Sequence, residues 1–119
     1  MIEVLPESSS SFLALKISGM VSEGDAERFG ELLEPLLQDE KTDSLFLDWQ
    51  DLEGWAPGAK SLATWFGMHN WSTMRRVAVV AAARWEDEKT RIADIYKRAE
   101  VRLFPPAKRV EAIDWARRE

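Results

Sequence analysis

A run of five consecutive apolar residues, Val77 to Ala81, constrains the fold of this chain more than any other feature. A strand that is covered on one face alternates apolar and polar residues, whereas a strand covered on both faces is apolar throughout. Two shorter apolar runs, 45–47 and 101–104, are separated from it by segments with helical periodicity. Strands that alternate with helices in this way indicate a mainly parallel sheet with right-handed crossovers.

The N-terminal part of the chain predicts a hairpin followed by a helix. Residues 2–5 and 12–18 are strand candidates separated by a turn-rich segment. Ser22 precedes Asp25 by three residues, which is the Asp variant of a capping box that satisfies free N–H groups at a helix start. Apolar residues then recur at three- and four-residue steps, so we expect a helix over 26–37.

Three further helices complete the predicted architecture. Two are expected at about 58–70 and 85–96, and a proline pair starts the last one, with Val110, Ile113 and Ala116 facing inward. The fold class is therefore α/β, a five-stranded mainly parallel mixed sheet with an N-terminal hairpin and four helices, in the order β-β-α-β-α-β-α-β-α. We expect helices on both faces, with the two middle helices forming the more mobile cover.

Composition sets the broad class of protein. A chain of 119 residues fits one domain, residues 1–119, and the chain has no cysteine for disulfide or thiolate chemistry. Its net charge of −5 argues against a nucleic-acid surface. It has no apolar stretch of the roughly 18–20 residues needed to span a membrane, no signal-peptide pattern at its start, and no glycine-rich cofactor motif. We therefore expect a soluble cytoplasmic protein without a cofactor.

Four of the six tryptophans lie between Trp49 and Trp71, just after the apolar run 45–47. In open α/β sheets, ligands bind in the crevice beyond the carboxyl ends of the strands. We expect Trp49 and Trp65 to be core residues, and Trp55 and Trp71 to line a cleft or a subunit contact, although a heavy core is the alternative. The candidate ligand-binding residues are Asp48, Trp49, Trp55, Trp65, Phe66, His69, Trp71 and Trp85.

Polar residues in the same region give weak signals for chemistry. Asp48, Asp51 and Glu53 could divide acid and base roles or bind a cation, but acidic turns between strand and helix usually cap backbone groups. His69 is the single histidine, so a zinc site is not expected, and we interpret it as a structural or cleft-lining residue. Arg84 and its basic neighbours could attract an anionic headgroup, but a solvated face is the simpler interpretation.

Several short segments, in this order and spacing, resemble the bacterial SpoIIAA-like family. They are Gly54-Trp55, RRVAVV at 75–80, Arg84-Trp85 and AEVRLF at 99–104, and the resemblance covers essentially the whole chain. It implies a STAS-like fold, related in shape to the lipid-binding CRAL-TRIO domain. The biochemical role of the family is poorly defined, so the resemblance mainly concerns the fold.

Two departures from the family pattern limit what the resemblance implies. The anti-sigma-factor antagonist that gives the family its name carries a phosphorylatable serine in the turn after its third strand, where this chain has Ala56-Pro57-Gly58. Many relatives have a glycine and an acidic residue after the fourth strand, where this chain has alanines at 81–83. A phosphoacceptor serine is therefore not carried over.

Three functional hypotheses follow. The first is a non-enzymatic module that binds a small apolar or lipid-like ligand in a tryptophan-lined cleft. The alternative is a protein-interaction or regulatory STAS-like module, and an enzyme that uses Asp48 and His69 ranks last. The many large side chains also predict a twofold homodimer, with Trp55 or Trp115 at the contact.

Overall fold

The computed structural model describes residues 2–9, 11–25, 27–29, 31, 43–56, 75–85 and 100–118. Its named elements are β1 (Ile2–Val4), β2 (Phe12–Ile17), β3 (Gly19–Val21), β4 (Ser44–Asp48), β5 (Leu52–Trp55), β6 (Arg76–Val80), the 3₁₀ turn η1 (Ala83–Trp85), β7 (Glu100–Phe104), the 3₁₀ turn η2 (Pro106–Lys108) and α4 (Arg109–Arg117). Residues 23–25, 27–29 and 31 are also helical. The helix expected at 58–70, and the one expected at 85–96 beyond Trp85, lie outside the described residues, and so does their expected mobility.

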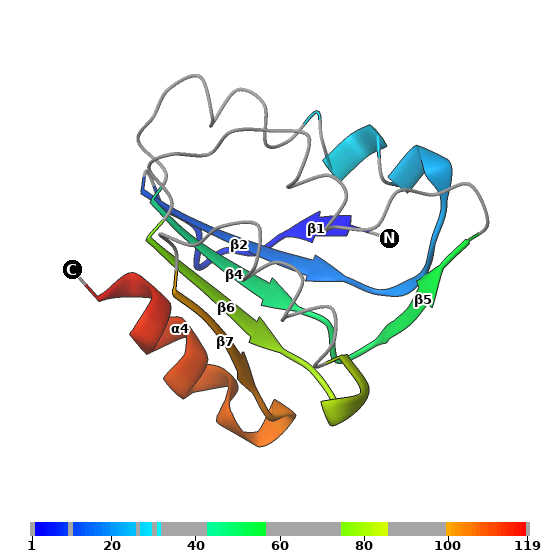
Figure 1. The fold of residues 1–119 in the computed structure, drawn as a ribbon. Helices are drawn as coiled ribbons and strands as arrows, with labels where there is room; N and C mark the ends of the chain where they lie inside the picture. The colour runs from blue at the N-terminus through cyan, green and yellow to red at the C-terminus, as the bar shows by residue number, and fades with distance from the viewer. Residues whose placement is uncertain are drawn as a thin grey trace.

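The large sheet has five strands in the order β1-β2-β4-β6-β7 (Figure 1). β1 pairs with β2 in antiparallel fashion, and the other three pairings are parallel. This is the mixed sheet with an antiparallel hairpin at its edge that the sequence predicts. β6 lies inside the sheet between β4 and β7, and Val79 and Val80 are both 0 % exposed, as their apolar run requires.

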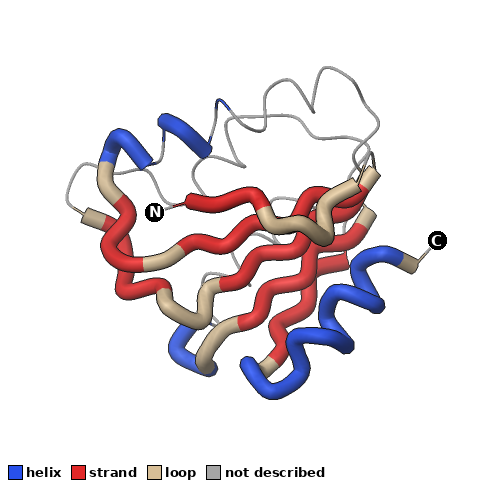
Figure 2. The backbone as a smooth tube through the Cα atoms, turned by 180° about the vertical axis from the view of Figure 1, so that it is seen from behind, coloured by secondary structure: helices blue, strands red, loops and turns tan. Residues whose placement is uncertain are grey.

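Side chains that alternate along the strands build two cores, one on each face of the sheet. The first core holds Leu45, Leu47, Val77 and Val79, together with Phe29 from the helical residues 27–29. The second core lies under α4 and holds Phe46, Ala78 and Val80 with the buried residues of that helix. Figure 2 shows α4 on one side of the sheet and the helical residues between 23 and 31 on the other. The described part of the chain thus has helical residues on both faces of the sheet, as expected.

The capping box expected at the start of the first helix is formed. The backbone N–H of Ser22 donates to Asp25 Oδ2 and the backbone N–H of Asp25 donates to Ser22 Oγ, both at 3.1 Å. The hydrogen bond from the Ser22 backbone lowers the pKa of the Asp25 carboxyl. This cap fixes the direction of the segment that brings Phe29, 2 % exposed, onto the sheet.

A second, two-stranded sheet was not predicted. β3 and β5 pair in parallel, with Val21 opposite Trp55 and a register shift between Gly19 and Met20. Gly54 has a φ of +150°, a conformation that side-chain-bearing residues rarely adopt. Strand pairing here overrides the poor local strand propensity of Glu53 and Gly54, the residues just before Trp55.

Ile113 and Ala116 face inward on α4 as predicted, but Val110 does not. The buried residues of α4 are Ala112, Ile113, Trp115 and Ala116, whereas Val110 is 70 % exposed. Arg109 takes the inward position of the first helical turn, where its guanidinium lies over the Phe46 ring at 5.4 Å. Positions 109, 112, 113 and 116 form one helical face, so Val110, one residue later, points about 100° away.

Candidate functional site

Three tryptophans, Trp49, Trp55 and Trp85, form a cluster that we call the tryptophan triad. Their ring centroids are 6.0 Å apart for Trp49 and Trp55, 6.0 Å for Trp49 and Trp85, and 5.4 Å for Trp55 and Trp85. All three contacts are edge-to-face, the arrangement that the charge distribution of aromatic rings favours. Trp49 is 1 % exposed, whereas Trp55 and Trp85 are half-buried against the first core. The triad therefore presents two partly accessible rings on a buried one.

Each ring of the triad comes from a different segment at the carboxyl ends of the central strands. Trp49 follows β4, and its backbone N–H donates to the Val80 carbonyl at the end of β6 at 2.8 Å. Trp55 ends β5, and Trp85 ends η1. This is the edge of an open α/β sheet where ligands bind in many proteins.

Arg84 ties the triad segments together. Its Nη2 donates to the Leu52 carbonyl at 2.8 Å, and its guanidinium carbon lies 5.0 Å from the centroid of the Trp85 ring. The contact thus links η1 to the start of β5, and the guanidinium covers one ring of the triad. Sequence reasoning treated Arg84 as a solvated rim residue. The Arg84-Trp85 pair was a possible signal, because arginine commonly stacks on aromatic rings.

The indole N–H of Trp49 is buried and has no hydrogen-bond partner within the described part of the chain. An unpaired buried donor costs free energy, and such groups are uncommon in folded proteins. The backbone of Trp49 is by contrast fully engaged, since its carbonyl accepts from the Leu52 N–H at 3.1 Å and its own N–H reaches Val80. Only the indole N–H of Trp49 therefore lacks a partner among the described residues.

Asp48 is 5 % exposed and lies in a different environment. Its Oδ1 accepts from the Gln50 backbone N–H at 3.1 Å, and its Oδ2 accepts from the Gln50 side-chain amide at 3.3 Å and from Arg109 Nε at 3.4 Å. Arg109 also pairs with Glu7 at 3.1 Å through its Nη2. The carboxylate thus caps the turn after β4 and links the start of α4 to the sheet.

The structure separates Asp48 from the tryptophans of the predicted site. Asp48 contacts α4 on one face of the sheet, whereas Trp49 belongs to the first core on the other. Adjacent residues of a strand point to opposite faces, so this separation was available from the sequence. Of the predicted ligand-binding residues, the structure brings together Trp49, Trp55 and Trp85. The other four, Trp65, Phe66, His69 and Trp71, lie outside the described residues.

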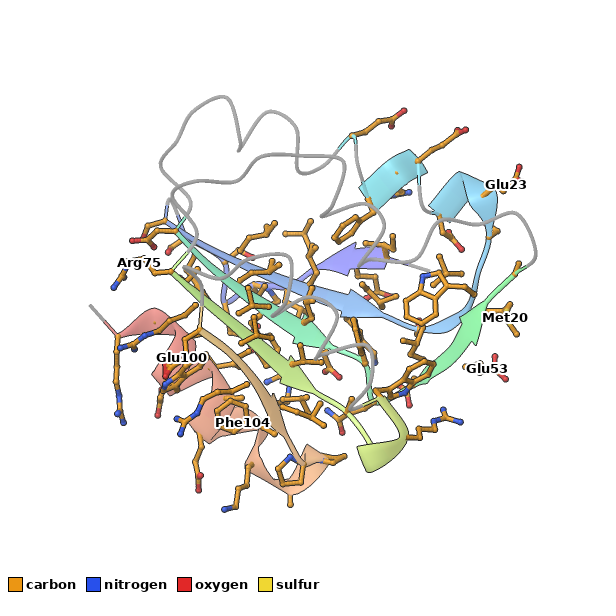
Figure 3. The ribbon with its side chains drawn as sticks, in the orientation of Figure 1. Met20, Glu23, Glu53, Arg75, Glu100 and Phe104 are labelled. Carbon is orange, nitrogen blue, oxygen red and sulfur yellow. The ribbon has the colours of Figure 1, made fainter. Side chains whose placement is uncertain are left out.

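The remaining acidic residues of the predicted cluster are exposed. Asp51 forms an ion pair with Lys16 at 3.2 Å, and this hydrogen bond and charge raise the pKa of the Lys16 ammonium. Figure 3 shows Glu53 and Met20 at the β3–β5 pair, at the opposite end of the molecule from Arg75 and Glu100. Across the part of the chain that the structure describes, no three His, Cys, Asp or Glu residues are grouped as metal ligands would be.

One surface feature has no counterpart in the sequence-based predictions. A depression of about 330 Å³ is lined by Gly24, Glu27, Arg28 and Glu31 on the helical segment after the capping box. It shares no residue with the triad, and its lining is mainly charged. Among the described helices, none is both long and apolar enough to cross a membrane.

The mixed sheet, covered on both faces, defines the STAS-like class of α/β folds, and comparisons with known proteins agree. A family model described as SpoIIAA-like matches residues 12–117, and the chain therefore belongs to the SpoIIAA-like family. Among the solved structures that match is an uncharacterized protein with a SpoIIAA-like fold from Shewanella loihica PV-4. It is 26 % identical, with a TM-score of 0.73 over 97 % of this chain and 93 % of that one. No curated protein matches the chain.

Proposed function

We propose that this protein is a non-enzymatic module that binds a small apolar or lipid-like molecule against the tryptophan triad. The observation that carries the proposal is the meeting of three indoles from three separate segments at the carboxyl ends of β4 and β6. Two of these rings are half-buried, so they keep apolar surface that a ligand can cover.

The surroundings of the triad support binding of an apolar body. The rings pack on a core of Leu, Val and Ile side chains, and Arg84 stacks on Trp85 at their edge. Burial of apolar surface is the main driving force for such binding, at about 25 cal/mol per Å². An amphipathic ligand would place its apolar part on the rings, with a polar group toward Arg84.

The carboxylate of Asp48 supports binding rather than catalysis as the role of this end of the sheet. It accepts hydrogen bonds from the backbone and side chain of Gln50 and from Arg109, so structural donors occupy three of its roughly four acceptor positions. A general base needs a carboxylate within hydrogen-bond reach of a substrate proton. The proposed module therefore uses the triad face, and Asp48 serves the fold.

The alternative is a protein-interaction or regulatory module, and exposed apolar residues favour it. Met20 on β3 is 53 % exposed and Val110 on α4 is 70 % exposed. A second copy of the chain is the partner we infer for this alternative, as a twofold dimer, because twofold pairing is the most frequent closed symmetry. Trp115, which we expected at the contact, is 7 % exposed, so Val110 is the better candidate on α4.

Native mass spectrometry of protein purified from its own host tests the binding proposal most broadly. We expect a retained small molecule that is lost on denaturation. The site is tested by titration with 8-anilinonaphthalene-1-sulfonate, an amphipathic fluorescent probe that has apolar aromatic rings and one sulfonate. Trp55→Ala should weaken its binding about tenfold, since about 60 Å² of lost apolar contact is worth about 1.4 kcal/mol.

Met20→Ala is the matched control, because Met20 lies on the strand that pairs with β5 but is exposed. Equal weakening by both variants, or no retained molecule and no probe binding, would overturn the proposal. Sedimentation across concentrations tests the dimer. A monomer up to about 100 μM contradicts it, because an interface that weak is worth under roughly 6 kcal/mol.

A further inference from the structure

We infer that the ligand of the tryptophan triad carries a neutral hydrogen-bond acceptor, a carbonyl-type oxygen, that accepts from the indole N–H of Trp49. This inference rests on the proposed function and names the ligand class for the same site. Its basis is the Trp49 Nε1 atom, which is buried and unpaired among the described residues, in a side chain that is 1 % exposed.

The rings that contact Trp49 cannot satisfy this donor. An indole nitrogen donates a hydrogen bond and accepts none, so Trp55 and Trp85 bring two more donors and no acceptor. The other side chains of the first core are aliphatic or aromatic hydrocarbons. Within the described part of the chain, the triad is thus a cluster of donors among apolar side chains, and an acceptor for Trp49 Nε1 is missing.

The fold also prevents Trp49 from turning away to find a partner. Its backbone is held on both sides, by the Val80 carbonyl and by the Leu52 N–H. Its ring is fixed between two edge-to-face contacts at 6.0 Å. The donor is therefore held in position before a ligand arrives, which reduces the ordering cost of binding.

The apolar surroundings select a neutral acceptor over a charged one. Burial of an unpaired carboxylate or phosphate in such a setting is strongly unfavourable, whereas a ketone, ester or amide oxygen needs a single donor. Arg84 is the cation described next to the triad. Its guanidinium lies over the Trp85 ring and already donates a hydrogen bond to the Leu52 carbonyl. The ligand class is therefore an apolar molecule with a carbonyl group at its buried end.

A matched pair of probes tests this inference on the full chain. Acetophenone and ethylbenzene have nearly the same shape, but acetophenone carries a carbonyl oxygen. Titration of ¹⁵N-labelled protein reports each probe on the indole N–H signals, and Trp49→Phe identifies the Trp49 signal by its loss. We expect acetophenone to bind about tenfold more tightly, as one hydrogen bond to a buried donor allows. It should also move the Trp49 signal downfield.

The variant Trp49→Phe should abolish the preference between the probes, because the indole donor is gone. Trp115→Phe, the control on the other face of the sheet, should leave the preference unchanged. Equal binding of both probes to the unmodified protein would overturn the inference and leave the proposed function intact. No binding of either probe would overturn both.

Discussion

Trp49 and Trp115 are both buried tryptophans, on opposite faces of one sheet, and their surroundings differ in kind. Trp115 has the guanidinium groups of Arg76 and Arg102 near its ring, at 5.3 and 5.2 Å, and Phe104 at 5.8 Å. Its carbonyl accepts from Arg76 Nη1 at 2.7 Å. Among the described residues, Trp49 has two indoles as ring neighbours and no partner for its indole N–H.

The comparison shows on which face of the sheet the buried polar groups have partners within the described part of the chain. On the α4 face, cations cover the Trp115 ring, and the buried Asp48 carboxylate has three donors. These cation–π contacts and charge-assisted hydrogen bonds stabilise the unliganded protein. On the described part of the triad face, the Trp49 indole N–H has no partner, at a cost in stability, which is the pattern expected where stability is given up for binding.

Trp115→Ala is expected to have the largest effect on stability. Removal of a buried tryptophan costs about 3–5 kcal/mol in the free energy of unfolding, and the lost cation–π contacts add to it. The affinity of the folded protein for 8-anilinonaphthalene-1-sulfonate should not change, because the triad lies on the other face of the sheet. Denaturant titration and probe titration measure the two effects. A loss of probe affinity in folded Trp115→Ala protein would show that the faces are coupled.

Asp48→Ala should have an intermediate effect on the free energy of unfolding, and it tests whether Asp48 stabilises the fold and takes no part in binding. It removes the acceptor of Gln50 and Arg109, so the free energy of unfolding should fall by about 1–3 kcal/mol. Probe affinity should remain, since no triad ring loses a contact. Asp48→Asn is the control, because it keeps an oxygen for the Gln50 N–H and should recover part of the loss. A full loss in Asp48→Asn would assign the effect to the charge instead.

The capping box on the triad face predicts a smaller, pH-dependent effect. The lowered pKa of Asp25 means that its stabilisation is fully present above its unfolded pKa, about 3.9, and is lost as the pH falls through the folded value. Ser22→Ala should cost about 1 kcal/mol at neutral pH. Asp25→Asn should show a weaker fall in stability below about pH 4 than the unmodified protein. An identical pH dependence of stability in Asp25→Asn and the unmodified protein would contradict a stabilising role of the Asp25 carboxylate.

Periodicity was sufficient to predict the large sheet because its inner strands are largely apolar, and its edge strands, β1 and β7, alternate apolar and polar residues. The burial of Val79 and Val80 and the capping box of Ser22 follow from the same local rules. The β3–β5 pair was not predicted because Glu53 and Gly54 are more typical of a turn than of a strand, and because the two strands are far apart in sequence. Ile113 and Ala116 of α4 were predicted correctly as inward residues, but Val110 was misassigned because an arginine, Arg109, takes the first inward position.

The candidate site was predictable in part. The tryptophans were expected beyond the carboxyl ends of the strands, and Trp49, Trp55 and Trp85 meet there. Trp49 was expected in the core, and it is buried. The mutual contact of the three rings depends on where β5 and η1 lie in space, which no local pattern encodes. The unpaired N–H of Trp49 depends on the same tertiary placement.

The central claim is that the triad face is incomplete without a ligand while the α4 face is complete, and one pair of variants tests it directly. Trp49→Phe and Trp115→Phe remove the same atoms from two buried positions, and denaturant titration without ligand gives their free energies of unfolding. We expect Trp115→Phe to lose about 1–2 kcal/mol through lost packing and cation–π contact. Trp49→Phe should change stability by less than about 0.5 kcal/mol, since relief of the unpaired donor offsets the lost volume. Equal losses at the two positions would contradict the account.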